Sequence, residues 1–277
     1  MSYLVIQGHE VETPDLKELA KLSGASRIEG IGNNAFRLHD YKTQEGVAAY
    51  CASAKLDFAF VPQPRKLSDF GLVAMDMDST LITIECIDEI ADLQGVKPQV
   101  AAITASAMRG EIEYRESLRR RLVLLEGLSE SALQRVYDER LKLSPGAERM
   151  LERVRSLGIK TLLVSSGFTF FTERLKERLS LDYTLSNTLA IENHKLTGKV
   201  LGRIVDAPAK AAKLRELRDG LRLSRDQVIA IGDGANDLAM MAEAGVSIAY
   251  HAKPVVRGKA TYCFDYVGLD GLLNFYA

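Results

Sequence analysis

The sequence contains few of the residues that build disulfide frameworks and transition-metal sites. Its 277 residues include three cysteines and four histidines. Cys51, Cys86 and Cys263 are odd in number and lie far apart, which fits neither a disulfide framework nor a zinc site. The patterns CxxC and HExxH do not occur. We therefore expect reduced, mostly buried thiols in a cytoplasmic protein.

A strong excess of charge of either sign is also missing. Lys and Arg number 36 against 37 Asp and Glu, and the formal net charge is −1. A nucleic-acid-binding protein usually carries a basic patch, and a polybasic membrane anchor needs a run of Lys and Arg. No apolar run reaches membrane-spanning length, and the N-terminus does not have the pattern of a signal peptide. The sequence thus predicts a cytoplasmic protein without nucleic-acid or membrane partners.

The length and the order of elements predict two domains. The chain is 47% hydrophobic and 26% charged, as in soluble globular proteins. Residues 1–66 are expected to form a ferredoxin-like α+β unit, because their elements follow the order β-α-β-β-α-β. The predicted strands are 3–6, 27–31, 35–38 and 58–61; the helices are 43–55 and one that Thr13 caps and Gly24 ends. Residues 32–34 form the expected turn, and 62–64 the linker.

Residues 67–277 predict a doubly wound parallel sheet. Four short apolar runs suggest buried parallel strands at 72–75, 161–164, 228–231 and 246–249. Helices are expected between them at 147–157, 170–179, 209–218 and 238–244. In such sheets, ligands bind beyond the carboxyl ends of the strands. The first three runs end in polar groups, at Asp76-Met77-Asp78, Ser165-Ser166-Gly167 and Gly232-Asp233-Gly234. That coincidence indicates an enzyme site.

A long insert separates the first two core strands. It covers about residues 86–143, and its pattern predicts helices at 86–93, 99–108, 114–126 and 129–140. An insert at the mouth of an α/β sheet is typical of a lid over the site. Residues 189–200, with Asn193-His194 at a turn, suggest a small β-hairpin.

Two acidic segments could hold a hard cation between them. A lone DxD such as Asp76-Met77-Asp78 is weak evidence, but its position at a strand end strengthens it. In Gly232-Asp233-Gly234, the glycines allow a sharp turn and a close approach to a ligand. Magnesium typically takes one or two carboxylates together with a substrate phosphate. A solvated Asn/Asp/Gly turn is the other interpretation of the second segment.

A hydroxyl and a lysine complete the set. Ser165 follows the second strand and lies near a predicted helix start, a position that suits a phosphate oxygen or simply caps the helix. Lys210 lies near the start of a helix, where the helix dipole slightly disfavours a cation, so it is a candidate phosphate ligand. Taken alone, an exposed lysine is the more common outcome.

Together these segments resemble the haloacid dehalogenase superfamily of phosphatases. Its four motifs occur in order, as DxDST at 76–80, Ser165, Lys210 and GDGxND at 232–237. The insert is similar to that of the phosphoserine phosphatases, at residues 85–90, 107–110 and 117–121. The N-terminal unit resembles the ACT-like domain that precedes the catalytic part in many bacterial members.

The resemblance implies phosphoserine hydrolysis, the last step of serine biosynthesis, and a role for each matching residue. Asp76 is the implied nucleophile and Asp78 the acid and base. Mg²⁺ is the implied cofactor, with Asp76, the backbone carbonyl of Asp78, and Asp233 as ligands. The implied substrate ligands are Glu85 for the ammonium group, Arg121 for the carboxylate, and Ser165, Ser166, Lys210 and Asn236. Asn236 and Asp237 support the lysine and its loop. Met108 is a candidate to cover the substrate, with an ordinary core methionine as the other interpretation.

The two acids need different pKa values to play different roles. The metal is expected to keep Asp76 ionised, while crowding by carboxylates and exclusion of water favour protonated Asp78. One departure from the family concerns residue 166. The family usually has Ser-Gly-Gly after the second strand, whereas this chain has Ser165-Ser166-Gly167. The backbone N–H of Ser166 is retained, but its Cβ disfavours any backbone conformation that only glycine adopts easily.

Several alternatives remain open on the sequence alone. One is a phosphatase or phosphotransferase for another amino-acid phosphate, such as homoserine phosphate. Another is a regulatory amino-acid-binding protein with a vestigial catalytic part, which the intact motifs disfavour. The inward-facing arginine of 119–121, the preferred enantiomer and the oligomeric state, with a homodimer as one option, are undetermined. The N-terminal unit is expected to be structural or dimerising, with feedback by serine as the second hypothesis.

Overall fold

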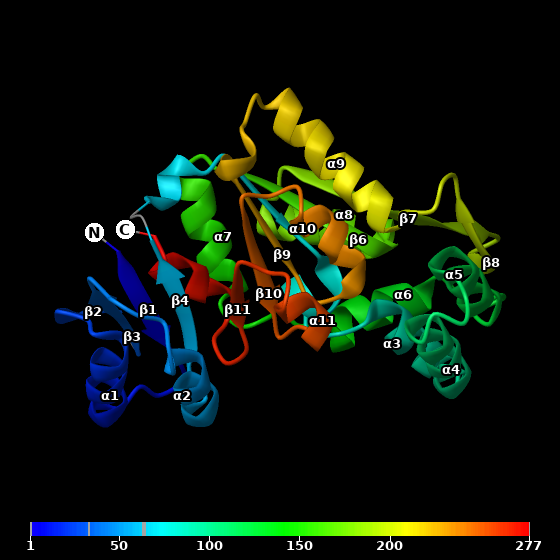
Figure 1. Ribbon diagram of the computed structural model, residues 1–277. Helices are drawn as coiled ribbons and strands as arrows, with labels where there is room; N and C mark the ends of the chain where they lie inside the picture. Colours follow the sequence, from blue (N-terminus) through cyan, green and yellow to red (C-terminus); the bar gives the residue numbers. More distant parts are fainter. Residues whose placement is uncertain (1, 33, 63–64, 277) are drawn as a thin grey trace.

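The N-terminal unit is a four-stranded antiparallel sheet with two helices on one face (Figure 1). The computed structural model describes residues 2–32, 34–62 and 65–276. The elements are β1 (Tyr3–Gln7), α1 (Thr13–Ser23), β2 (Arg27–Gly32), β3 (Ala35–His39), α2 (Val47–Ala54) and β4 (Asp57–Val61). The strand order β2-β3-β1-β4 is that of the predicted ferredoxin-like pattern.

Two details of this unit differ from the prediction. Glu12, not Thr13, precedes helix α1, and its backbone N–H donates to the Asp15 carboxylate at 3.2 Å. Helix α2 begins at Val47 rather than at residue 43, because Gly46 adopts a left-handed conformation with φ 77° that a helix does not continue through. The described residues do not include Asn33 of the predicted turn. They also do not include residues 63–64 of the predicted linker.

The larger sheet has seven strands in the order β11-β10-β9-β5-β6-β7-β8. They are β5 (Leu72–Met75), β6 (Lys160–Phe168), β7 (Tyr183–Glu192), β8 (Lys195–Leu201), β9 (Val228–Gly232), β10 (Val246–Tyr250) and β11 (Tyr262–Phe264). All neighbours pair in parallel except β7 and β8. The chain leaves β5 toward β6 and later returns to its other side at β9. The strand order therefore reverses at β5, where ligands bind in such folds.

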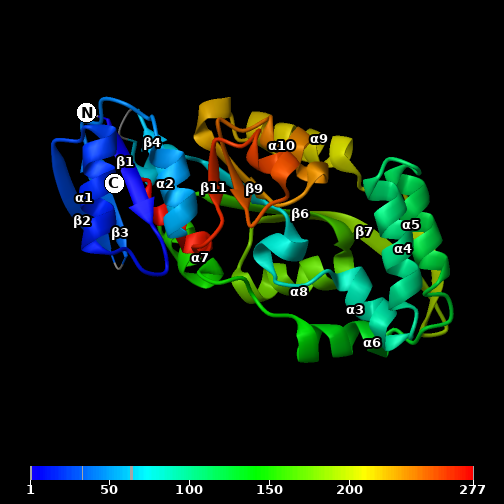
Figure 2. The same cartoon turned by 60° about the horizontal axis from the view of Figure 1, so that its bottom comes forward.

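Helices cover both faces of this sheet (Figures 1 and 2). On one face lie α7 (Ala147–Ser156) and α8 (Thr169–Leu179); on the other lie α9 (Ala207–Gly220) and α10 (Leu238–Met241), followed in the chain by α11 (Pro254–Arg257). Helix α9 buries Leu214, and α10 buries Met240, against the alternate residues Leu72 and Ala74 of β5. Within the described part of the chain, no helix is long and apolar enough to cross a membrane.

The predicted insert forms a helical cap beside the carboxyl ends of the strands (Figure 2). It contains α3 (Cys86–Leu93), α4 (Lys97–Met108), α5 (Tyr114–Val123) and α6 (Ser131–Arg135), which continues as a wider turn over Val136–Arg140. The β7–β8 hairpin packs against this cap: Gly127 donates to the Leu196 carbonyl and Leu196 to the Leu128 carbonyl, both at 2.8 Å. The predicted hairpin at 189–200 is therefore the outer part of a longer strand pair that supports the cap.

The N-terminal sheet packs on the C-terminal segment of the chain (Figure 1). The buried Asp57 carboxylate accepts backbone N–H groups of Asp265, Tyr266 and Val267 at 2.8 to 2.9 Å. The Tyr3 hydroxyl donates to the Phe275 carbonyl at 2.7 Å. Residues of β1 and β4 also belong to the same apolar cluster as residues of the larger sheet, so the two units are joined by packing as well as by the chain between them.

Asp57→Ala is expected to lower the free energy of unfolding by about 3 kcal/mol, because three backbone donors lose their acceptor and only some of them gain water. Denaturant unfolding of the full chain measures the change. Glu45→Ala, which removes an exposed carboxylate from the same unit, is the control. A loss below about 1 kcal/mol, typical of one ordinary hydrogen bond, would show that Asp57 does not hold the units together.

Candidate active site

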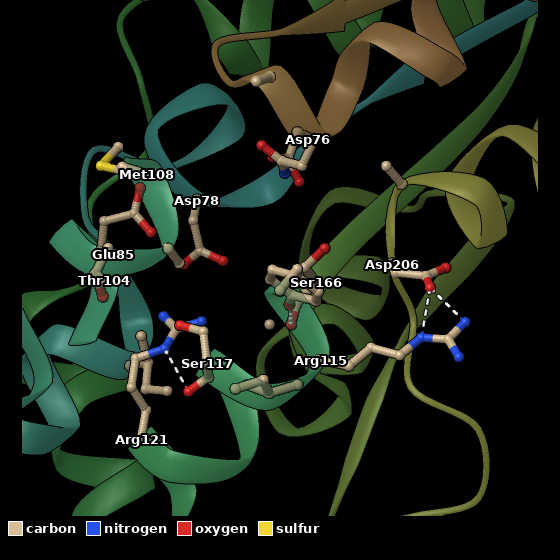
Figure 3. A pocket seen from close by; sticks show the side chains of 18 of the residues that line it. Asp76, Asp78, Glu85, Thr104, Met108, Arg115, Ser117, Arg121, Ser166 and Asp206 are labelled. Carbon is tan, nitrogen blue, oxygen red and sulfur yellow. Dashed lines mark hydrogen bonds and ion pairs between the residues drawn. The ribbon is translucent and has the colours of Figure 1, made fainter. Parts of the chain in front are cut away.

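Asp76 lies at the carboxyl end of β5, where the strand order reverses. Its backbone N–H still donates to Ile231 of β9, at 3.0 Å, so the strand pairing fixes its position. The chain then turns sharply, and Ser79 adopts a left-handed conformation with φ 56°. This turn brings the second carboxylate of the motif, Asp78, to the same pocket as Asp76. The side chains appear together in Figure 3.

Lys210 joins two of the buried carboxylates. Its ammonium group lies 2.8 Å from Asp76 Oδ1 and 2.8 Å from Asp237 Oδ1, and the side chain is fully buried. Burial alone lowers the pKa of Lys210, but the neighbouring Asp237 and Asp76 carboxylates outweigh it and raise that pKa. Lys210 is therefore a fixed cation directly behind Asp76. The family resemblance implied that Asp237 supports Lys210, which agrees with this contact, whereas Lys210 taken alone favoured an exposed lysine.

Three buried carboxylates face one another in this region. Oxygens of Asp76, Asp233 and Asp237 lie within 4.8 Å of one another. Burial raises the pKa of Asp76 well above its usual range, and Asp237 raises it further. Burial and Asp237 also raise the pKa of Asp233 to about 6. Lys210 supplies one positive charge beside these three carboxylates, and Lys253 acts on Asp233 from the cavity wall. With all three carboxylates ionised, negative charge would exceed positive charge in this cluster.

Asp78 is held at both carboxylate oxygens. One accepts from the backbone N–H of Cys86 at 2.8 Å, and the other from the Ser165 hydroxyl at 3.2 Å. Burial raises the pKa of Asp78, although these hydrogen bonds oppose the shift. We expected both burial and neighbouring carboxylates to raise the pKa of Asp78. Burial does so, but the neighbouring carboxylates raise mainly the pKa of Asp76.

The last residues of β6, which extends to Phe168, explain the departure at residue 166. Ser166 does not adopt a left-handed φ, so its Cβ is compatible with the backbone. Glycine is needed at the next position instead. A Cβ on Gly167 would lie 2.8 Å from Asp78 Oδ2 and 3.0 Å from Ser165 Oγ. Ser165 is fully buried, and its hydroxyl accepts from the Gly167 N–H at 2.8 Å.

A cavity of about 780 Å³ lies between these strand ends and the cap. Its lining includes the predicted residues Asp76, Asp78, Glu85, Met108, Arg121, Ser166, Asp233 and Asn236. Ser165, Lys210 and Asp237 do not line it and lie behind the carboxylates that do. The structure thus brings all predicted residues to one region, in two layers.

The cap presents Glu85 and Arg121 to this cavity (Figure 3). Burial raises the pKa of Glu85 to about 7, and the Asp78 carboxylate raises it further. Among the described residues, the Ser79 hydroxyl is the only side-chain donor to the Glu85 carboxylate, at 2.8 Å. Arg121 lines the cavity, while Arg119 and Arg120 point to Glu116 on the outer side of α5. Of the three arginines, Arg121 is the inward-facing one.

Four of the cavity-wall residues that sequence reasoning missed are Tyr114, Arg115, Asp206 and Lys253. Tyr114 donates its hydroxyl to the Ser166 carbonyl at 3.2 Å, and Arg115 pairs with Asp206 at 2.8 Å, so both join the start of α5 to the core. Lys253 lies on the core side. Asp206 had a recognisable signal as the residue before Ala207-Pro208, where it caps α9. The other three had no signal, because their neighbours come from distant parts of the chain.

Comparison with known proteins supports this geometry. The profile of the haloacid dehalogenase-like hydrolases matches residues 73–242, and that of a domain of unknown function (DUF4072) matches residues 4–45. The phosphoserine phosphatase of Polaromonas sp. is 54% identical over 214 residues, which cover 76% of this chain and 91% of the relative. The phosphoserine phosphatase of Haemophilus influenzae is 49% identical over 220 residues, covering 79% of this chain and 68% of the relative.

Solved structures agree with the sequence relatives. The unliganded crystal structure of a probable phosphoserine phosphatase from Vibrio cholerae has a TM-score of 0.86 and is 38% identical, covering 99% of this chain and 85% of the other. The predicted α/β core with a helical cap and a separate N-terminal sheet is confirmed. The chain belongs to the haloacid dehalogenase-like hydrolases and, within them, to the phosphoserine phosphatases.

Proposed function

We propose that the chain hydrolyses O-phosphoserine to serine and phosphate through a phosphorylated Asp76, the reaction that ends serine biosynthesis. The observation that carries this proposal is the arrangement of charges around one cavity. Asp76 and Asp78 lie on the core side, and Glu85 and Arg121 on the cap side. A phosphate ester that also bears an ammonium and a carboxylate group matches both sides.

The two aspartates divide the chemistry between them. In the first step, an Asp76 oxygen forms a bond to phosphorus, the bond from phosphorus to the serine oxygen breaks, and Asp78 gives that oxygen a proton. In the second step, a water oxygen bonds to phosphorus, Asp78 takes the proton from the water, and the bond to Asp76 breaks. The raised pKa of Asp78 supports its starting the cycle as an acid.

The carboxylate cluster fits a magnesium ion. The closely spaced carboxylate oxygens of buried Asp76, Asp233 and Asp237 suit a small divalent cation with oxygen ligands, which would favour their ionised forms. Asp76, the backbone carbonyl of Asp78, and Asp233 would hold it. When bound, Mg²⁺ supplies positive charge that offsets the phosphate dianion. Asp237 is assigned to Lys210, with which it shares a 2.8 Å contact, rather than to the ion.

Four residues are assigned to the phosphate group. Ser166 and Asn236 line the cavity and would bind it through backbone or amide N–H groups. Ser165 and Lys210 do not line the cavity but contact the two aspartates that do. The Ser165 hydroxyl orients Asp78, and the Lys210 ammonium group orients Asp76. Both would bind phosphate oxygens only by turning partly away from these carboxylates.

Arg121 and Glu85 are assigned to the serine part of the substrate. Arg121→Ala is expected to lower kcat/KM for phosphoserine about tenfold to hundredfold, since a hydrogen-bonded pair with a charged group is worth about 1.5–3 kcal/mol. Glu85→Gln is expected to act similarly at the ammonium group. An aryl phosphate carries neither group, so its hydrolysis falls much less. Arg119→Ala is the matched control, because Arg119 lies on the same helix but faces Glu116.

Two results would contradict this recognition role. If phosphoserine and the aryl phosphate lose kcat/KM equally, Arg121 and Glu85 serve the chemistry or the cap. If neither substrate is affected, phosphoserine is not the substrate that this cavity selects.

We also propose that residues 1–66 form an ACT-like regulatory or dimerising domain and that residues 67–277 form the phosphatase, with its cap at about 86–143. The ferredoxin-like strand order supports the first assignment. A homodimer would follow if this domain mediates self-association, which sedimentation of the full chain tests. The proposed location is the cytoplasm, in keeping with three free thiols, two of them buried.

A further inference from the structure

Ser117 is a buried hydroxyl without a partner at the cavity wall. The residue is fully buried on α5, it lines the cavity, and its Oγ makes no hydrogen bond within the described part of the chain. An unsatisfied buried hydroxyl costs free energy, and native structures contain few of them. The position therefore requires an explanation.

The usual arrangement of such a hydroxyl is seen elsewhere in the chain. Ser23, also fully buried in a helix, donates to the Leu19 carbonyl four residues earlier, at 2.7 Å. Thr104, which lines the same cavity, donates to the Val100 carbonyl at 3.1 Å. Ser117 makes no such bond to its own helix. Its hydroxyl is thus left available for a partner that the ligand-free arrangement does not provide.

The nearest cation on the same helix face is Arg121. Positions 117 and 121 are four residues apart, so their side chains are neighbours on α5, and Figure 3 shows them together at the cap side of the cavity. The Arg121 Nε currently donates to the Ser117 backbone carbonyl at a long 3.4 Å. Among the described residues, Arg121 forms no ion pair within 4.0 Å, although its charge acts on Asp88, where it opposes the rise in pKa that burial causes.

We propose that Ser117 is a positioning residue for substrate recognition: its hydroxyl accepts an N–H of Arg121 when that guanidinium turns to the substrate carboxylate. The inference rests on the proposed phosphoserine phosphatase function and adds a residue to it. The hydroxyl fixes one edge of the guanidinium, which leaves another edge for two parallel bonds to the carboxylate. Ser117 itself needs no contact with the substrate, in agreement with its complete burial.

The test compares phosphoserine with phosphoethanolamine, which is the same ester without the carboxylate. Ser117→Ala is expected to lower kcat/KM for phosphoserine about tenfold, the size of one hydrogen bond to a charged group, and to leave phosphoethanolamine within about twofold. Ser117→Cys keeps the volume but bonds weakly, so it is expected to lose as much as the alanine variant. In an Arg121→Ala background, Ser117→Ala is expected to have no further effect.

Ser23→Ala is the matched control: it removes a fully buried helical hydroxyl outside the site and is expected to leave the ratio of the two substrates unchanged. Three outcomes would overturn the inference: an equal loss on both substrates, no loss on phosphoserine, or a loss that persists without Arg121. Its failure is distinguishable from failure of the proposed function. In the latter case, the unmutated enzyme itself would not prefer phosphoserine to phosphoethanolamine.

Discussion

Asp76→Asn is expected to abolish phosphoserine hydrolysis, with a loss of roughly 10⁶-fold in kcat, as found when other enzymes lose their nucleophile. A carboxamide oxygen does not form the proposed bond to phosphorus. The fold is expected to remain, because the substitution removes one of three crowded negative charges and keeps the size of the side chain. The measurement is kcat with phosphoserine, together with a thermal unfolding curve for each sample.

Asp219→Asn provides the matched control, since Asp219 is an exposed carboxylate of the same domain, at the end of α9. It is expected to retain full activity. Substantial turnover by pure, folded Asp76→Asn protein would exclude the covalent mechanism. Loss of the folded state would instead assign Asp76 a structural role in binding Lys210.

Removal of metal ions by a chelator is expected to stop turnover, and added Mg²⁺ to restore it. The physical reason is the uncompensated charge of Asp76, Asp233 and Asp237, which would repel a phosphate dianion. Ca²⁺ is expected to restore activity poorly, because it takes more ligands at longer distances than Mg²⁺. The measurement is kcat against free metal concentration after dialysis.

Asp233→Asn separates metal binding from general damage to the site. It is expected to raise the Mg²⁺ concentration needed for half-maximal activity while the protein stays folded. The Thr80 hydroxyl, which donates to Asp233 at 3.1 Å, can still bond to the amide oxygen. Full activity in excess chelator, or an unchanged Mg²⁺ requirement in this variant, would contradict the metal role of Asp233.

The sequence predicted the four central strands of the larger sheet, because local patterns encode them. Apolar runs before Asp76 and Asp233 mark strand ends, and parallel strands place those ends together. Ser165 was also expected after a strand, but it lies inside β6, which continues to Phe168 beyond a shift in its pairing with β7. The short strand β11 was missed because three residues carry too little periodicity. The inner part of β7 was missed because Thr184, Ser186 and Asn187 interrupt its apolar pattern.

What the sequence could not show is how side chains from distant segments meet. Taken alone, Lys210 was expected to be exposed, and only the family resemblance made it a site residue; it is fully buried between two carboxylates. The pair Arg115 and Asp206 joins positions 91 residues apart, and neither residue type is unusual where it occurs. The Ser117 hydroxyl makes no hydrogen bond within the described part of the chain, a feature that only the folded structure reveals.

The most direct test of the central claim is a burst experiment with Asp78→Asn protein and an aryl phosphate. The aryl oxide is a good leaving group, so phosphorylation needs little help from an acid, whereas hydrolysis of the intermediate still lacks its base. We predict a rapid release of one equivalent of aryl alcohol per enzyme, followed by slow turnover, and a phosphoryl group on the peptide that contains Asp76 after acid quenching. The absence of both the burst and the label, or a label on another residue, would contradict the proposed mechanism.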